Sequence, residues 1–124
     1  MRVLVCGGRH FDDTRAVWDA LDAQNARRPI TLLIEGGEGG ADLSASNWAV
    51  ARGIRHETFR AARKTQGWAA DPIRNQRMID EGKPDLVIAF PGGRRAADMV
   101  RRARMAGIEV LEPLNNDEPS RSAP

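Results

Sequence analysis

The chain has 124 residues and a mass of 13.6 kDa, a size that fits one domain with one hydrophobic core. Hydrophobic residues make up 41% and charged residues 29%, and the net charge of +2 does not indicate nucleic-acid binding, because acidic residues are spread among the basic ones. No apolar run reaches the ~18 residues of a membrane span, and the first one is too short for a signal peptide. The single cysteine cannot form an internal disulfide, so we expect no membrane partner and a reducing, cytoplasmic location.

The N-terminal segment has the pattern of a buried strand followed by a helix. Residues 3–6 are apolar and end in Gly7-Gly8, as in a central parallel strand with a tight turn behind it. Capping residues and apolar side chains at helical spacing then predict a helix over residues 13–26, which ends at Arg28-Pro29.

The same order of elements repeats in the next segment. A second strand, residues 31–34, runs into the densest glycine cluster of the chain, residues 36–40. A helix is predicted from residue 41, and Gly53 stands at the usual C-terminal stop. Residues 56–59 predict a third, weaker strand.

Residues 60–70 are basic and irregular, and we interpret them as the longest loop of the chain. Long loops in compact domains are often functional. Asp71 and Pro72 then predict the N-cap and the first position of a helix that runs to about Glu81.

The last third of the chain contains the clearest anion-binding pattern. The apolar run Leu86–Phe90 ends in Pro91-Gly92-Gly93, and a helical pattern begins at once and stops at Gly107. Such a turn brings free backbone N–H groups and the positive end of a helix dipole to one point, where anions bind. Residues 109–112 predict a last strand, and we expect a domain over residues 1–113 and a disordered tail over residues 114–124.

Strands that alternate with helices predict an α/β fold: a single Rossmann-like domain with a parallel sheet of about five strands and helices on both faces. Ligands of such sheets bind at the carboxyl ends of the strands. Three of the predicted strands end in glycine pairs, at Gly7-Gly8, Gly36-Gly37 and Gly92-Gly93. We therefore predict a site for a nucleotide or another phosphate-containing ligand at that edge.

Four segments carry a family pattern. They are Val3-Leu4-Val5-Cys6-Gly7-Gly8-Arg9, Ile34-Glu35-Gly36-Gly37 with Gly40-Ala41-Asp42, Pro72-Ile73-Arg74-Asn75-Gln76-Arg77-Met78, and Phe90-Pro91-Gly92-Gly93 with Ala97-Asp98-Met99. Together they resemble the bacterial YspA-type proteins of the SLOG superfamily, over roughly residues 1–112. That superfamily also contains the Lonely Guy phosphoribohydrolases and the DNA-processing protein DprA. The resemblance implies a Rossmann-like fold, a nucleotide-derived ligand, and self-association into a homodimer or a higher oligomer.

The Lonely Guy enzymes are similar over two segments only, around Arg74 and from Pro91 to Met99. Arg95, Ala96 and Met99 stand where those enzymes carry glycine, threonine and glutamate. Cleavage of an N-glycosidic bond needs a carboxylate, so these departures favour ligand binding over turnover. Asp98 is the candidate catalytic residue, and capping of the helix is its alternative role.

The candidate ligand-binding residues lie in the glycine turns and in the helix that begins near Pro72. They are Gly7, Gly8, Arg9, Gly36, Gly37, Gly40, Asp42, Arg74, Asn75, Pro91, Gly92, Gly93 and Arg94. We expect Arg9, Arg74 and the backbone around Gly93 to hold a phosphate, because a guanidinium pairs well with phosphate oxygens. Asp42 either binds ribose hydroxyls or is a first-turn acid favoured by the helix dipole.

Several other side chains have two interpretations. Glu35 and Glu38 are either solvated or hold Arg9 and Arg74 in place. Arg95 either fills the pocket or adds a cation to it, and Trp68 either stacks on a base or anchors the loop. Cys6 is expected to be a small buried hydrophobe, and His10 and His56 do not form a metal-binding pattern, so we expect neither a metal nor a cofactor.

Three functional hypotheses follow. The leading one is sensing or sequestration of a nucleotide-derived small molecule. The second is phosphoribohydrolase-type cleavage of a nucleoside monophosphate, with Asp98 in place of the missing glutamate. The third, not favoured, is DprA-like binding of single-stranded nucleic acid through the basic residues of the 60–70 loop and Arg101, Arg102 and Arg104.

Overall fold

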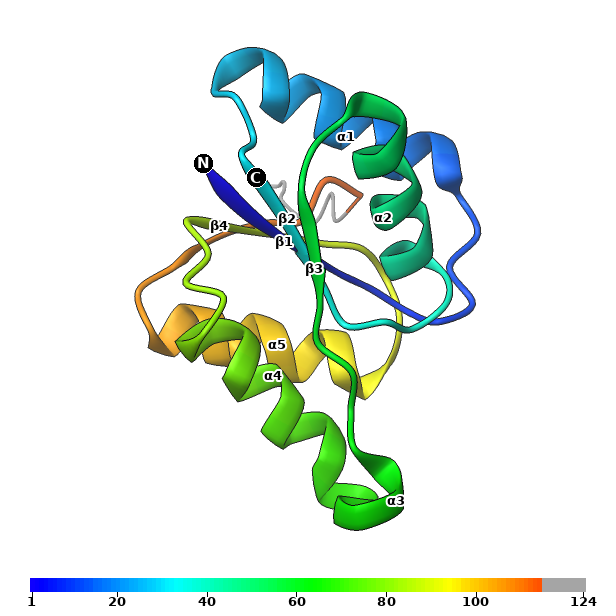
Figure 1. Cartoon of the computed structure of the whole chain (residues 1–124), viewed down its shortest axis with the longest axis vertical. Helices are drawn as coiled ribbons and strands as arrows, with labels where there is room; N and C mark the ends of the chain where they lie inside the picture. Colours follow the sequence, from blue (N-terminus) through cyan, green and yellow to red (C-terminus); the bar gives the residue numbers. More distant parts are fainter. Residues whose placement is uncertain (115–124) are drawn as a thin grey trace, which may run out of the picture.

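Five parallel strands form one sheet in the order β3-β2-β1-β4-β5 in the computed structural model, which describes residues 1–114 (Figure 1). The strands are β1 (Arg2–Cys6), β2 (Leu32–Glu35), β3 (His56–Thr58), β4 (Leu86–Ala89) and β5 (Glu109–Leu111). The helices are α1 (Thr14–Arg27), α2 (Ala41–Arg52), α3 (Arg63–Gln66), the 3-10 turn η1 (Gly67–Ala69), α4 (Ala70–Asp80) and α5 (Gly93–Met105). The predicted α/β class, with a single Rossmann-like parallel sheet, is confirmed.

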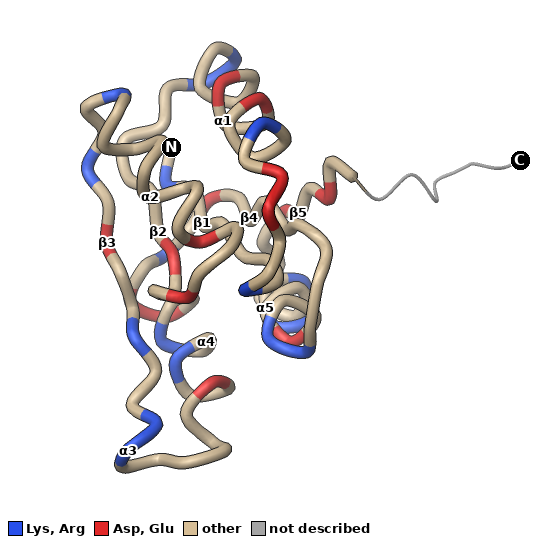
Figure 2. Tube along the Cα trace, turned by 90° about the vertical axis from the view of Figure 1, so that its right-hand side faces the viewer, with Lys and Arg blue, Asp and Glu red and all other residues tan. Residues whose placement is uncertain are grey.

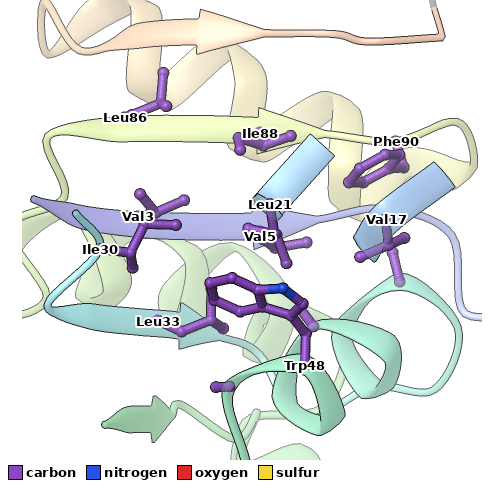
Figure 3. Packing of buried hydrophobic residues seen from close by; sticks show 13 residues of the cluster. Val3, Val5, Val17, Leu21, Ile30, Leu33, Trp48, Leu86, Ile88 and Phe90 are labelled. Carbon is purple, nitrogen blue, oxygen red and sulfur yellow. The ribbon is translucent and has the colours of Figure 1, made fainter. Parts of the chain in front are cut away.

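Helices cover both faces of the sheet, α1 and α2 on one side and α4 and α5 on the other (Figure 1). Successive side chains of a strand point to opposite faces, so Val3 and Val5 pack under α1 and α2 while Leu4 and Cys6 pack against α4 and α5. Figure 3 shows Trp48 of α2 among the side chains of β1 and β2, and its exposed fraction is 0%. The two cores hold the sheet rigid and so fix the positions of the loops at its carboxyl edge.

The order of the strands reverses between β1 and β4. The chain adds β2 and β3 on one side of β1, then crosses over and adds β4 and β5 on the other side. The connection after β1 therefore runs to α1 on one face, and the connection after β4 runs to α5 on the opposite face. Such a reversal separates two neighbouring loops and leaves a crevice between them, which is where open α/β sheets bind ligands.

Two local predictions were wrong. The 60–70 segment is not one irregular loop, because it contains α3 and η1 and passes directly into α4. Consequently Asp71 is not an N-cap: Ala69 occupies that position, and Asp71 lies in the first turn of α4, where its carboxylate pairs with arginines instead. The pattern at Asp71-Pro72 located the helix, but α4 begins two residues before Pro72 because it continues directly from η1.

The prediction for the C-terminal tail lies almost wholly outside the described residues. Of the segment 114–124, the structure describes only Leu114, which is exposed. Within residues 1–114, no helix has the length and apolar character needed to cross a lipid bilayer.

Candidate functional site

A crevice opens at the carboxyl ends of β1 and β4, at the point where the strand order reverses. Its volume is about 620 Å³. One wall is the turn after β1, and the other is the turn after β4 together with the start of α5. The lining residues are Gly7, Gly8, Arg9, His10, Phe11, Asp71, Pro91, Gly92, Gly93, Arg94 and Arg95.

The turns after β1, β2 and β4 pack directly on one another through their glycines. The Gly8 N–H donates a hydrogen bond of 3.0 Å to the Pro91 carbonyl oxygen, and a Cβ on Gly92 would lie 2.7 Å from the Gly8 Cα. Gly40 has a φ of +63°, and a Cβ there would lie 2.1 Å from the Gly8 oxygen. Backbone contact therefore explains why three glycines stand here, independently of any ligand.

Gly93 differs from these glycines. Its φ is +72°, and a Cβ built on it meets no atom within 4 Å, so the position faces open space. The residue begins α5, and Gly92 before it offers no side chain to cap the helix. Within residues 1–114, the backbone N–H groups of Gly93, Arg94 and Arg95 have no hydrogen-bond acceptor. The start of α5 thus presents free donors and the positive end of a helix dipole to the crevice.

Two arginines add positive charge at this point. Arg94 is exposed and forms no ion pair within the described part of the chain. Arg9 stands in the opposite wall, where its guanidinium lies 3.7 Å from Glu38 and is 43% exposed. Both can therefore contribute to holding an anion at the N-terminus of α5.

A chain of alternating charges runs behind the crevice. Glu38 lies 2.5 Å from Arg63 and 3.4 Å from Arg74 in addition to its contact with Arg9. Asp71 accepts from Arg63 at 2.7 Å and from Arg95 at 2.8 Å. Burial alone would raise the pKa of Glu38, but the hydrogen bond and charge of Arg63, with further arginine charges, outweigh it and lower that pKa. Of the two interpretations of Glu38, the structure therefore favours the one in which it holds arginines in place.

The same network settles the position of Arg95. Its side chain is 30% exposed and ties the start of α5 to Asp71 in α4, so the guanidinium lines the crevice without filling it. Burial would raise the pKa of Asp71, but the hydrogen bonds and charges of Arg95 and Arg63 lower it. Asp71 is thus an ionised partner of arginines in the crevice wall.

Arg74 and Asn75 do not line the crevice. The Arg74 side chain is 3% exposed, and its guanidinium donates to the Gly36 oxygen at 2.7 Å and to Asn75 Oδ1 at 2.9 Å. The Asn75 amide nitrogen donates to the Arg95 oxygen at 3.1 Å and to Asp98 at 3.0 Å. These side chains form a buried polar layer that ties α4 to the turn after β2 and to α5.

Gly36 and Gly37 belong to the turn after β2, Asp42 lies in the first turn of α2, and all three likewise lie outside the crevice lining. Asp42 Oδ2 accepts from the N–H groups of Gly36 and Glu38, both at 3.2 Å, and closes that turn. Burial and the nearby charge of Glu35 raise the pKa of Asp42 to about 7, against the lowering effect of those two N–H groups and of Arg74. Its partners are backbone groups of the turn that precedes α2 rather than an open surface.

Asp98 does not cap α5, because it lies beyond the first turn of a helix that begins at Gly93. It accepts from Arg102 at 2.7 Å and from Asn75 at 3.0 Å, and it pairs with Arg101. Partial burial would raise the pKa of Asp98, but these hydrogen bonds and arginine charges lower it. A carboxylate held in this way is a weak base and a poor proton donor.

His10 and Phe11 are crevice residues that were not among the predicted site residues. Phe11 packs on Phe90, with ring centroids 5.4 Å apart. The sequence signal that could have identified His10 and Phe11 is their position directly after the Gly7-Gly8-Arg9 turn.

Cys6 is buried as predicted, and burial raises the pKa of its thiol, which keeps it in the unreactive protonated form. Within residues 1–114, no cluster of three or more His, Cys, Asp or Glu side chains is placed to hold a metal ion.

The chain is similar to a described protein family and to a phage protein. The model of the YspA, cpYpsA-related SLOG family matches residues 1–65, which include the turns after β1 and β2. The chain is also 38% identical over 120 residues to the Gene 61 protein of Mycobacterium phage D29. That alignment covers 89% of this chain and 94% of the phage protein, so the similarity extends through the turn after β4.

Proposed function

This chain belongs to the YspA, cpYpsA-related SLOG family, and from that premise we propose that it binds a nucleotide or nucleotide-derived ligand in the crevice between β1 and β4. In this proposal a phosphate group of the ligand sits at the start of α5. The glycine turns after β1 and β4 form the walls, and Arg9 and Arg94 supply the opposing charge.

One observation carries the proposal. Successive backbone N–H groups of α5 open into a crevice that Arg94 also lines, and within residues 1–114 neither these N–H groups nor the Arg94 guanidinium has an acceptor or ion-pair partner. Hydrogen bonds to a charged group contribute about 1.5–3 kcal/mol each, so two such N–H groups and one arginine supply about 4.5–9 kcal/mol, which corresponds to a Kd between about 0.5 mM and about 0.3 μM for a phosphate-bearing ligand. A helix start of this kind is a ready anion site.

The carboxylates favour binding over turnover. Among the residues that line the crevice, Asp71 is the carboxylate, and it is paired with Arg63 and Arg95. Asp98 is likewise paired, and its pKa is lowered. Neither is suited to donate a proton to a leaving base or to activate water, so sensing or sequestration is the proposed role.

The test is calorimetry of the protein against a panel of nucleoside phosphates, ADP-ribose species and cyclic nucleotides. We expect at least one member to bind, and Arg94→Ala to weaken that binding about tenfold or more, because a charge-assisted contact is lost. Arg104→Ala is the matched control: it removes the same charge from an exposed side chain of α5 that does not line the crevice. No binding by any member of the panel, or equal losses in both variants, would contradict the proposal.

Self-association and a cytoplasmic location remain proposals that rest on the sequence. Sedimentation velocity of the purified protein tests the first, and fractionation of expressing cells tests the second.

A further inference from the structure

Trp68 is the feature of the surface that the phosphate site leaves unexplained. Its exposed fraction is 93%, whereas Trp48 is fully buried at 0%. We propose that Trp68 forms a stacking subsite for the base of the nucleotide, so that the ligand runs from the start of α5 to this ring. This inference rests on the proposed function, since it assumes a phosphate at Gly93 and Arg94.

Trp68 lines a hollow of its own. The hollow has a volume of about 460 Å³ and lies between η1 with the first turn of α4 and the first turns of α5. Pro72 and Ala97 provide apolar wall, and Arg94 and Arg101 provide positive charge. Such a site suits a flat, electron-rich ring that is attached to an anionic group.

The hollow adjoins the crevice. Asp71, Arg94 and Arg95 line both, and the 2.8 Å ion pair of Arg95 with Asp71 is the wall that the two share. A ligand whose phosphate contacts the N–H groups of Gly93 and Arg94 therefore reaches Trp68 by passing over this ion pair. Arg94 stands at the junction, where it can contact the phosphate from either side.

The segment that carries Trp68 is tied to the rest of the site. Arg63, in α3, binds Glu38 at 2.5 Å and Asp71 at 2.7 Å, and so joins this segment to the turn after β2 and to α4. Figures 1 and 2 show α3 at the end of the molecule opposite α1, next to the start of α4. The segment that carries this exposed aromatic ring is therefore anchored beside a positively charged helix start.

The residues that line the hollow around Trp68 favour stacking on the face of a base over hydrogen bonds to its edges. Asn75 is the amide side chain of the hollow, and both of its polar ends are occupied, Oδ1 by Arg74 and Nδ2 by the Arg95 oxygen and Asp98. Asp71 and Asp98 are paired with arginines. Because every base has a π-face, the subsite is expected to accept purines and pyrimidines with small differences in affinity.

The experiment compares ligands with and without a base. Adenosine 5′-monophosphate, uridine 5′-monophosphate and ribose 5-phosphate are titrated into wild type, Trp68→Ala, Trp68→Phe and Leu43→Ala. Leu43 is an exposed apolar residue of α2 away from the site and serves as the control. Trp68 is almost fully exposed, so its variants should fold normally, and circular dichroism checks this.

We expect both nucleotides to bind wild type about tenfold or more tightly than ribose 5-phosphate, in line with the strength of base–aromatic stacking. Trp68→Ala should remove that difference and leave ribose 5-phosphate unchanged, Trp68→Phe should restore most of it, and Leu43→Ala should have no effect. Binding of a nucleotide should also quench tryptophan fluorescence in wild type and not in Trp68→Phe.

Three results would overturn the inference, and they separate it from the proposed function. Equal binding of nucleotides and ribose 5-phosphate, both sensitive to Arg94→Ala, would retain the phosphate site and remove the base subsite. No binding of any of the three compounds by wild type would remove both. Trp68-dependent, strongly salt-dependent binding of single-stranded DNA without mononucleotide binding would assign the ring to nucleic acid instead.

Discussion

Replacing Gly93 with alanine would place a methyl group in the crevice at the start of α5. A Cβ at this position meets no protein atom within 4 Å, so the substitution creates no clash with the protein itself. Its cost to folding comes from the backbone, because φ is +72° and side-chain-bearing residues disfavour that region by about 1–2 kcal/mol. For a domain of this size the loss corresponds to a fall in Tm of about 4–8 °C.

Gly53 provides a matched control. Its φ is +69°, a Cβ there also meets nothing within 4 Å, and the residue follows α2 far from the crevice lining. Gly53→Ala should therefore lose about the same ~1–2 kcal/mol of unfolding free energy as Gly93→Ala. The two variants separate the cost of backbone strain from the effect of filling the crevice.

Ligand binding should distinguish the two variants. A methyl group at Gly93 would keep a phosphate from reaching the N–H groups of α5, and losing even one charge-assisted hydrogen bond of about 1.5–3 kcal/mol weakens binding about tenfold to a hundredfold. We expect this loss in Gly93→Ala and wild-type affinity in Gly53→Ala, measured by calorimetry with a nucleotide that binds the wild type. Wild-type affinity in Gly93→Ala would refute the placement of the phosphate at the start of α5. Equal losses in both variants would assign the effect to stability.

Two further predictions concern the loops that shape the crevice. Gly40→Ala should cost more than ~3 kcal/mol in urea unfolding, because its Cβ would lie 2.1 Å from the Gly8 oxygen. Gly67 has a similar backbone conformation, with φ +56° and ψ −130° against φ +63° and ψ −126° at Gly40, but a Cβ there meets no atom within 4 Å. Gly67→Ala should therefore cost only the backbone strain of about 1–3 kcal/mol, and similar costs in both variants would contradict the close packing of the turns. The second prediction concerns the pH dependence of stability, because the pKa of Asp42 is about 7 in the folded protein against an ordinary 3.8. The folded state therefore binds this proton more tightly than the unfolded state does. As pH rises from about 4 to about 7, the contribution of Asp42 to the free energy of unfolding falls by at most ~4 kcal/mol. Asp42→Asn keeps an acceptor for the Gly36 and Glu38 N–H groups and should lose that part of the pH dependence, so that its stability relative to wild type is higher at pH 8 than at pH 5; an unchanged pH profile would count against the raised pKa.

The glycine turns show which features of the candidate site the sequence pattern predicted and which it did not. The pattern located the turns at the ends of β1, β2 and β4 correctly, because an apolar run followed by glycines is a local signal. It did not distinguish a glycine that another turn requires, such as Gly40, from one that faces open space, such as Gly93. That distinction depends on which backbone comes close to the Cα, and residues far apart in the chain decide it.

Arg74 and Arg94 show the same limit for side chains. Both follow from motifs that predict a phosphate contact, and both carry the same charge. In the folded chain Arg74 is buried against carbonyl oxygens of two loops and the amide oxygen of Asn75 in its own helix, while Arg94 is exposed without an ion-pair partner in residues 1–114. Whether an arginine is buried or ion-paired depends on how α4 and α5 pack against the rest of the protein. The spacing of residues within one helix does not predict that packing.

The sequence by itself determined the class of fold, the family and the order of the five strands and the four longer helices, but not the short α3 and η1, because apolar periodicity and glycine stops act over a few neighbouring residues. Only the tertiary structure decided that β4 returns to the far side of β1, that the two turns there enclose a crevice, and that Arg74 and Asp42 lie behind it. The physical reason is that strand order and the pairing of buried charges depend on contacts between residues distant in the chain, such as Arg74 with Gly36 and Gly8 with Pro91.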